Sequence, residues 1–229
     1  MARYAWEKPY FKNREEAAKL LVEKLSEYRG KNPLVLAIPR GAVPMGRILA
    51  RELGGELDVI LVRKVGAPDN PEFALGAVGE GGELYIAPYA SSFHYSDEVI
   101  EAEAKKQVQI LKERRKLYTP YRPSVDAQGR IVILVDDGIA TGSTAMAALR
   151  ELHRRAPLRI VVATAVIPPE VVEKLHQEAH EVVALAVTSE FGAIGEFFED
   201  FRQVSDEEVV RILREMNPGS PNPKTGKKK

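Results

Sequence analysis

Two neighbouring acidic residues stand between an apolar run and a turn rich in glycine and hydroxyl groups. Ile131–Val135 is apolar, Asp136 and Asp137 follow it, and residues 138–144 read Gly-Ile-Ala-Thr-Gly-Ser-Thr. A short apolar run bounded by turn residues predicts a buried strand. The two acids then lie at the carboxyl end of that strand, which is where open parallel sheets bind their ligands.

The turn after the acids combines three features that bind phosphate. Its glycines let backbone N–H groups approach a ligand closely, its hydroxyls add donors, and the start of the next helix supplies free N–H groups with a favourable dipole. The acids repel phosphate, so they must face a hydroxylic, cationic or metal-bound group nearby. A ribose 5-phosphate meets both demands. The alternative is a tight turn in which the acids only cap a helix.

The segment from Val132 to Thr144 resembles the phosphoribosyl pyrophosphate signature of the type I phosphoribosyltransferases. The resemblance implies that Asp136 and Asp137 are catalytic, that they hold the ribose hydroxyls and a Mg²⁺ ion, directly or through water, and that Asp137 handles the proton of the nucleophile. It also implies which residues bind the 5-phosphate: Ala140, Thr141, Gly142, Ser143 and Thr144.

Basic residues after two other predicted strands extend this resemblance. Pro39-Arg40-Gly41 resembles the pyrophosphate loop of the family, which implies a cis bond between Pro39 and Arg40. Arg63-Lys64 resembles the start of the mobile catalytic loop. The resemblance therefore implies that Arg40, Gly41, Arg63 and Lys64 bind pyrophosphate, and that Lys64 is also catalytic.

Alternating patterns of helix and strand must position these residues. Apolar periodicity and capping residues predict helices at 13–30, 43–53, 96–118, 144–154 and 170–180, and strands at 34–38, 57–62, 130–135, 160–166 and 182–187. Alternation of this kind predicts an α/β fold with a mostly parallel central sheet and helices on both faces. Residues 63–72 are rich in proline and glycine and predict a long loop, which we expect to extend to about residue 80 and to close over the site.

The C-terminal part of the chain predicts an accessory segment and a tail. We expect one phosphoribosyltransferase domain over 1–216, a small hood at 188–202 in which Phe191 stacks on a base, and a disordered basic tail at 217–229. The hood is implied by a loose resemblance to purine-specific relatives. Other aromatic residues of this segment are candidates for the core.

Composition restricts the protein's class and partners. The 33 basic and 33 acidic residues balance, so no overall positive field attracts nucleic acid, and we expect no nucleic-acid partner. The basic stretch from Lys105 to Arg122 could form an RNA-binding surface, but glutamates at helical spacing favour an ordinary charged helix. Cysteine is absent, which excludes disulfides and thiolate sites. Without a signal-like or membrane-spanning apolar segment, we expect a soluble cytoplasmic protein that forms a homo-oligomer.

The expected function is transfer of ribose 5-phosphate from phosphoribosyl pyrophosphate to a nucleobase or similar nitrogen acceptor, with Mg²⁺ as cofactor. One alternative is a regulator of the same fold that senses phosphoribosyl pyrophosphate or a nucleotide. Another is a magnesium-dependent phosphatase that uses the paired acids, but that function leaves the Thr-Gly-Ser-Thr turn without a role. The sequence does not name the acceptor.

Overall fold

The computed structural model describes residues 10–93, 95–120, 124–190 and 192–217. The helices and strands follow in the order β1 (Phe11–Asn13), α1 (Arg14–Lys24), η1 (Ser26–Tyr28), β2 (Leu34–Ala37), α2 (Val43–Leu53), β3 (Glu56–Val59), β4 (Val62–Ala67), β5 (Asn70–Gly79), β6 (Leu84–Ile86), η2 (Pro88–Ser92), α3 (Asp97–Tyr118), β7 (Ile131–Asp136), α4 (Ser143–Arg154), β8 (Arg159–Ile167), α5 (Pro169–His176), β9 (Glu181–Val187), η3 (Ile194–Phe197), β10 (Phe198–Asp200) and α6 (Asp206–Met216).

A five-stranded parallel sheet forms the centre of the molecule, in the order β3-β2-β7-β8-β9. Its strands alternate with helices, which confirms the predicted α/β class. The chain leaves β2 toward one edge and β7 toward the other, so the order reverses between these two neighbours. Ligands of open parallel sheets bind at such a reversal, beyond the carboxyl ends of the strands.

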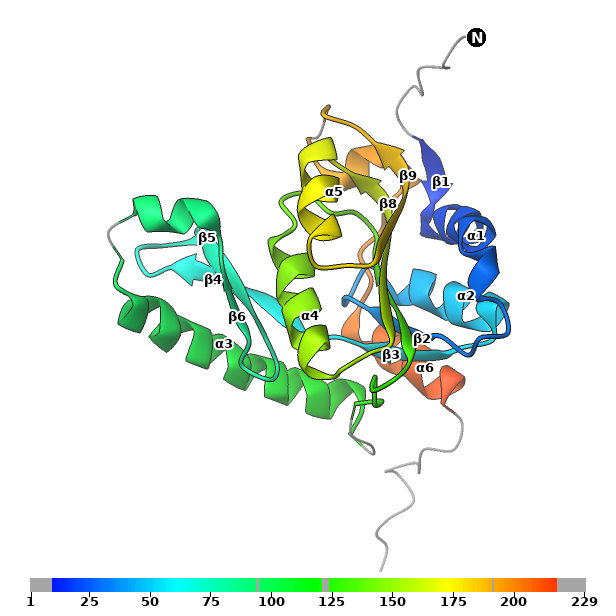
Figure 1. Ribbon diagram of the computed structural model, residues 1–229, viewed down its shortest axis with the longest axis horizontal. Coiled ribbons are helices and arrows are strands. Elements are labelled where there is room, and N and C mark those ends of the chain that lie inside the picture. Colours follow the sequence, from blue (N-terminus) through cyan, green and yellow to red (C-terminus); the bar gives the residue numbers. More distant parts are fainter. Residues whose placement is uncertain (1–9, 94, 121–123, 191, 218–229) are drawn as a thin grey trace, which may run out of the picture.

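Helices cover both faces of this sheet, and successive side chains of each strand serve opposite faces. In β7, Ile133 belongs to the core formed with α1, α2 and α6, whereas Leu134 belongs to the core formed with α4 and α5. Figure 1 shows α4 and α5 on one side of the sheet and α1, α2 and α6 on the other. The middle strand is therefore buried on both sides, as its apolar sequence predicts.

A lobe made of β4, β5, β6 and α3 projects from this core (Figure 1). The three strands form an antiparallel sheet. The prediction of a long loop at 63–72 is therefore wrong: Pro68 and Asp69 form the turn of a hairpin, and the pairing of β4 with β5 shifts on either side of Gly66. Pro71 falls where the register is interrupted, so its missing N–H costs no regular ladder bond.

Buried charges fasten this lobe to the core. The guanidinium of Arg115 on α3 donates to Glu80 at 2.6 Å and 2.9 Å, and to Oδ1 of Asp58 at 3.2 Å. Asp58 is fully buried and also accepts from the backbone N–H of Val125 at 2.8 Å. The basic stretch at 105–122 thus supplies one of its arginines to the interior. Lysines of the same stretch form ordinary surface pairs with glutamates, as between Lys116 and Glu113.

The predicted hood segment forms a small layer beside the N-terminus of α1. In it, β10 pairs in parallel with β1, with Phe11 opposite Phe198. Helix α6 follows, which the sequence analysis did not predict. Asn217 ends this helix by donating to the carbonyls of Leu57 and Leu213, and the rest of the expected tail lies outside the described residues. Of the described helices, none combines the length and apolarity that crossing a membrane requires.

Candidate functional site

The two acids lie at the carboxyl end of the middle strand. Asp136 is the last residue of β7, paired with Thr164 of β8, and Asp137 follows directly. The backbone N–H of Asp137 donates to Oδ1 of Asp136 at 2.9 Å. Asp137 is buried and accepts a 2.8 Å hydrogen bond from Nε of Arg14. The acid pair therefore lies at the reversal of strand order, and the guanidinium of Arg14 contacts one of the two acids, Asp137.

Burial raises the pKa of both carboxyls. For Asp136 the loss of hydration acts most strongly, and the charge of Asp137 adds to it, so its pKa lies well above the usual range. For Asp137 burial raises the pKa, while the Arg14 guanidinium opposes the rise. Burial therefore favours the protonated form of both carboxyls, and the Arg14 guanidinium favours the ionised form of Asp137. Proton handling by Asp137 remains a prediction, and its contact with Arg14 makes it the weaker base.

The turn after the acids leads into the N-terminus of α4. Gly142 precedes the helix with φ of 75°, a left-handed conformation that favours glycine. The hydroxyl of Thr141 donates to that of Ser143 at 3.3 Å and accepts from the N–H of Ser143 at 3.5 Å, while Gly142 at the N-cap has no side chain to cap the helix. Ala140 and Thr141, directly before this helix start, are exposed. The predicted phosphate residues thus form one continuous turn and helix start beside the acid pair.

The predicted pyrophosphate loop follows the neighbouring strand β2. The bond between Pro39 and Arg40 is cis, as the resemblance implies. Gly41 packs directly against Asp137: a Cβ placed on it would lie 2.9 Å from Cγ of that residue. Glycine is therefore required here by the acid pair itself, before any ligand is considered. The structure brings this loop and the two acids into one site.

A carboxylate holds the guanidinium of Arg40. Asp206, the first residue of α6, lies 3.3 Å from Nη1 of Arg40 and also accepts a hydrogen bond from the hydroxyl of Tyr118. Burial first, and this hydrogen bond second, raise the pKa of the Tyr118 hydroxyl, which stays protonated as a donor. The last turn of α3, the start of α6 and the pyrophosphate loop therefore meet at one carboxylate.

Arg63 and Lys64 are separated by the strand that carries them. Adjacent residues of a strand point to opposite faces. Arg63 shares its face of β4 with buried Val65, which packs in the core with α3. Burial and the charge of Arg114 lower the pKa of Arg63. Lys64 lies on the opposite face and is exposed. Pyrophosphate binding by both remains a prediction, and it requires contributions from two faces of the hairpin.

The aromatic residues of the hood mostly serve its own packing. Phe197 and Phe198 are buried, as expected of core residues. Phe201 stacks on Phe198 with ring centroids 4.9 Å apart, and the guanidinium of Arg14 covers it at 3.7 Å from its centroid. Phe201 is thus in contact with both Phe198 and Arg14. The predicted base-stacking residue, Phe191, lies outside the described residues.

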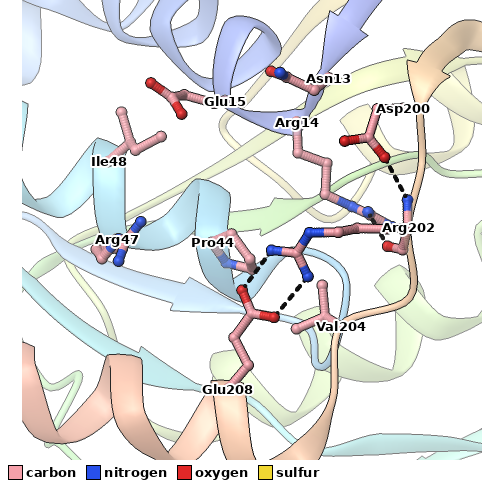
Figure 2. A pocket seen from close by; sticks show the side chains of 10 residues that line it. All are labelled: Asn13, Arg14, Glu15, Pro44, Arg47, Ile48, Asp200, Arg202, Val204 and Glu208. Atoms are coloured by element: carbon pink, nitrogen blue, oxygen red, sulfur yellow. Dashed lines mark hydrogen bonds and ion pairs between the residues drawn. The ribbon is translucent and has the colours of Figure 1, made fainter.

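A cavity of about 230 Å³ adjoins Arg14 between α1, α2 and the segment from β10 to α6. Figure 2 shows Arg14 extending from α1 and Arg202 extending from the segment after β10 toward Glu208. Arg202 forms a bidentate ion pair with Glu208 at 2.8 Å and 2.9 Å. Arg47 also lines the cavity and lies 3.6 Å from Glu215. The cavity shares Arg14 with the acid pair, and none of the predicted ligand-binding residues that the structure describes lines it.

Three residues of this arrangement escaped the sequence analysis: Arg14, Tyr118 and Asp206. Each lies far along the chain from the residue it contacts; Arg14 and Asp137 are separated by 123 positions. No local pattern distinguishes an arginine at the start of a helix from an exposed one. Correlated substitutions among relatives are the signal that could have paired them.

The donor atoms suit a magnesium ion that arrives with a substrate. Among the described residues, no group of three or more histidine, aspartate or glutamate side chains could hold a metal. Two adjacent carboxylates at an open strand end fit Mg²⁺, which prefers oxygen ligands, keeps several waters and usually shares its coordination with substrate phosphates. Asp136 is the better placed of the two, because Arg14 already contacts Asp137.

Known proteins resemble this chain over most of its length. Residues 10–196 match the sequence model of a family described as "Phosphoribosyl transferase domain". A Mycobacterium tuberculosis protein named "Putative phosphoribosyl transferase Rv0571c" is 37% identical over 204 residues, 89% of this chain. The chain covers 46% of that relative, so it spans about half the length of the curated relatives it matches. TT1426 from Thermus thermophilus, whose crystal structure is known, is 50% identical in sequence to this chain. The two structures superpose with a TM-score of 0.77 over 90% of this chain and 98% of that one.

Proposed function

Since the chain belongs to the phosphoribosyltransferase family, we propose that it transfers ribose 5-phosphate from phosphoribosyl pyrophosphate to a nitrogen acceptor and releases pyrophosphate. One observation carries this proposal. The acid pair, the start of α4 and the loop at Gly41 meet at the reversal between β2 and β7. A helix start suits the 5-phosphate, the acid pair suits the ribose hydroxyls, and the loop suits the pyrophosphate. Phosphoribosyl pyrophosphate carries these three groups side by side.

Each part of the site has a role in this reaction. The N–H groups and hydroxyls at 140–144 bind the 5-phosphate. Asp136 and Asp137 accept hydrogen bonds from the ribose hydroxyls, and Arg40 with the loop amides binds the pyrophosphate. A bound magnesium ion would supply positive charge that neutralises the pyrophosphate. The hairpin of β4 and β5 brings Arg63 or Lys64 to the leaving group and excludes water when it closes.

The carboxylates have a second role as the reaction proceeds. The bond from C1 of the ribose to the pyrophosphate oxygen breaks, a bond from the acceptor nitrogen to C1 forms, and the proton of that nitrogen leaves. Positive charge develops on the ribose before the new bond is complete. Fixed negative charge at the end of β7 stabilises this state more than the neutral sugar, which accelerates the chemical step.

Turnover with a panel of nucleobases tests the proposal. Wild-type protein is incubated with magnesium, phosphoribosyl pyrophosphate and one base at a time, and base-dependent release of pyrophosphate is measured. Release with at least one base is expected. Binding of phosphoribosyl pyrophosphate without turnover for any base would favour the sensing regulator instead.

The double variant Asp136→Asn with Asp137→Asn assigns the activity to the acid pair. Each lost charge-assisted hydrogen bond weakens binding by about 1.5–3 kcal/mol, so calorimetry should show a loss of at least tenfold in affinity for magnesium phosphoribosyl pyrophosphate. Asp126→Asn is the matched control, because Asp126 is exposed and caps only the N–H of Gln128. Unchanged affinity in a folded double variant would contradict the assignment.

A further inference from the structure

Arg14 is held by three separate contacts at the junction of the acid pair and the hood. Its Nε donates to Oδ2 of Asp137 at 2.8 Å, its Nη1 donates to the backbone carbonyl of Arg202 at 2.8 Å, and its guanidinium lies on the ring of Phe201 at 3.7 Å. The side chains of Arg14 and Asp137 are 11% and 10% exposed. The guanidinium therefore has little freedom to reorient.

The chain around Arg14 places it for this contact. It is the first residue of α1, which the side chain of Asn13 caps by accepting from the N–H of Glu16 at 3.0 Å. Asn13 also pairs with Asp200 across the strands β1 and β10. The backbone that carries Arg14 is thus fixed on one side by a helix start and on the other by the hood.

The acid pair needs such a partner for geometric and electrostatic reasons. Two adjacent carboxylates repel each other, and a ligand that hydrogen-bonds to both requires their oxygens at fixed positions. The fork of a guanidinium fixes the direction of a carboxylate as well as its charge. Gly41 abuts the same Oδ2 of Asp137 that Arg14 contacts, and a Cβ added to Gly41 would lie 3.2 Å from Nη2 of Arg14. Gly41 and Arg14 therefore both restrict the position of this carboxylate oxygen.

We propose that Arg14 is a positioning residue that aims the Asp137 carboxylate at the ribose of phosphoribosyl pyrophosphate and couples this alignment to the hood. The inference rests on the proposed function and adds to it a residue outside the signature segment. It assigns Arg14 no direct contact with the substrate. The hood contributes through Phe201 and the Arg202 carbonyl, so displacement of the hood would misalign the donor site.

Calorimetry with two ligands tests this role. Arg14→Gln should weaken binding of magnesium phosphoribosyl pyrophosphate on the order of ten- to a hundredfold, the size expected for a charge-assisted hydrogen bond. It should leave the affinity for magnesium pyrophosphate within about twofold, because that ligand has no ribose. General loosening of the site would weaken both ligands equally. Arg14→Lys should recover only part of the loss, because an ammonium group lacks the planar fork.

Arg47→Gln is the matched control. Arg47 lines the same cavity and loses the same charge, but its partner is Glu215, so its affinity for both ligands should equal that of the wild type. Each variant is first shown to be folded by circular dichroism and thermal unfolding. If Arg14→Gln does not fold, Arg14→Lys is compared with the wild type by the same criterion.

The outcomes separate the inference from the function on which it rests. Wild-type protein that binds phosphoribosyl pyrophosphate, with a folded Arg14 variant that binds it equally well, overturns the positioning role and leaves the proposed function in place. Equal losses for both ligands also overturn it. Wild-type protein with no affinity for phosphoribosyl pyrophosphate removes the proposed function, and the role of Arg14 with it.

Discussion

A single methyl group at Gly41 tests the close packing of the pyrophosphate loop on the acid pair. A Cβ built there lies 2.9 Å from Cγ of Asp137, nearer still to its Oδ2, and 3.2 Å from Nη2 of Arg14. The carboxylate oxygen must retreat by roughly 1.5 Å to restore ordinary van der Waals contact. Gly41 is not among the glycines with positive φ, so the backbone accepts alanine and the methyl group is the main perturbation.

The structure sets the expected size of the effect. Overpacking of this kind costs about 1–3 kcal/mol. The carboxylate cannot retreat without stretching its 2.8 Å hydrogen bond to Arg14, and loss of a partner from a buried ion pair costs about 3–5 kcal/mol. Because the contact with Arg14 is stretched and not removed, we expect Gly41→Ala to lower the free energy of unfolding by about 2–3 kcal/mol. Urea denaturation followed by circular dichroism measures this change.

A double-mutant cycle identifies the group that the methyl strikes. Asp137→Ala removes the carboxylate, so adding Gly41→Ala to it should cost less than about 0.5 kcal/mol. Equal losses in the wild-type and Asp137→Ala backgrounds would show that the methyl group meets something else, and would refute the packing argument.

Three further predictions concern the lobe, its attachment and the edge of the sheet. Residues 66–80 should gain hydrogen-exchange protection when magnesium phosphoribosyl pyrophosphate binds, and equal protection with and without it would exclude closure of the hairpin. Asp58→Ala leaves Arg115 without one buried partner, so chemical denaturation should show a loss of about 3–5 kcal/mol; a loss below about 1 kcal/mol would mean that water replaces the carboxylate. Burial, aided by a hydrogen bond to Glu181, raises the pKa of Tyr28 to about 12. Its contribution to stability is therefore complete below about pH 10 and is lost as the pH rises toward 12, and Tyr28→Phe should lack that part of the alkaline decrease in unfolding free energy.

The sequence determined the strand, turn and helix that carry the acid pair, because local signals there agree. The apolar run before Asp136 is stable only when it is buried, so β7 lies in the interior. Gly142 adopts the left-handed conformation that precedes α4. Alternation of such units predicted the parallel sheet, and with it the edge where the acids lie. The resemblance of the same segment to a known family supplied the cis bond at Pro39.

The hairpin of β4 and β5 shows where local signals mislead. Proline and glycine at 66–71 break regular structure in isolation, and they predicted a loop. In the folded chain Pro68 and Asp69 form the turn, and the register shift at Gly66 absorbs the irregular residues. Helix α3 and the Arg115 ion pairs hold the strands in place. Pairing between strands and burial against a distant helix decided this structure.

Sequence alone thus determined which residue types lie at the carboxyl ends of β2 and β7, and tertiary structure decided how those residues are held. Arg14 meets Asp137 because the start of α1 lies beside the end of β7, and Asp206 meets Arg40 because α6 folds back onto the loop after β2. Such contacts join residues far apart in the chain, so no periodicity or spacing encodes them. Their energy comes from burial and charge that exist only when the whole domain has folded.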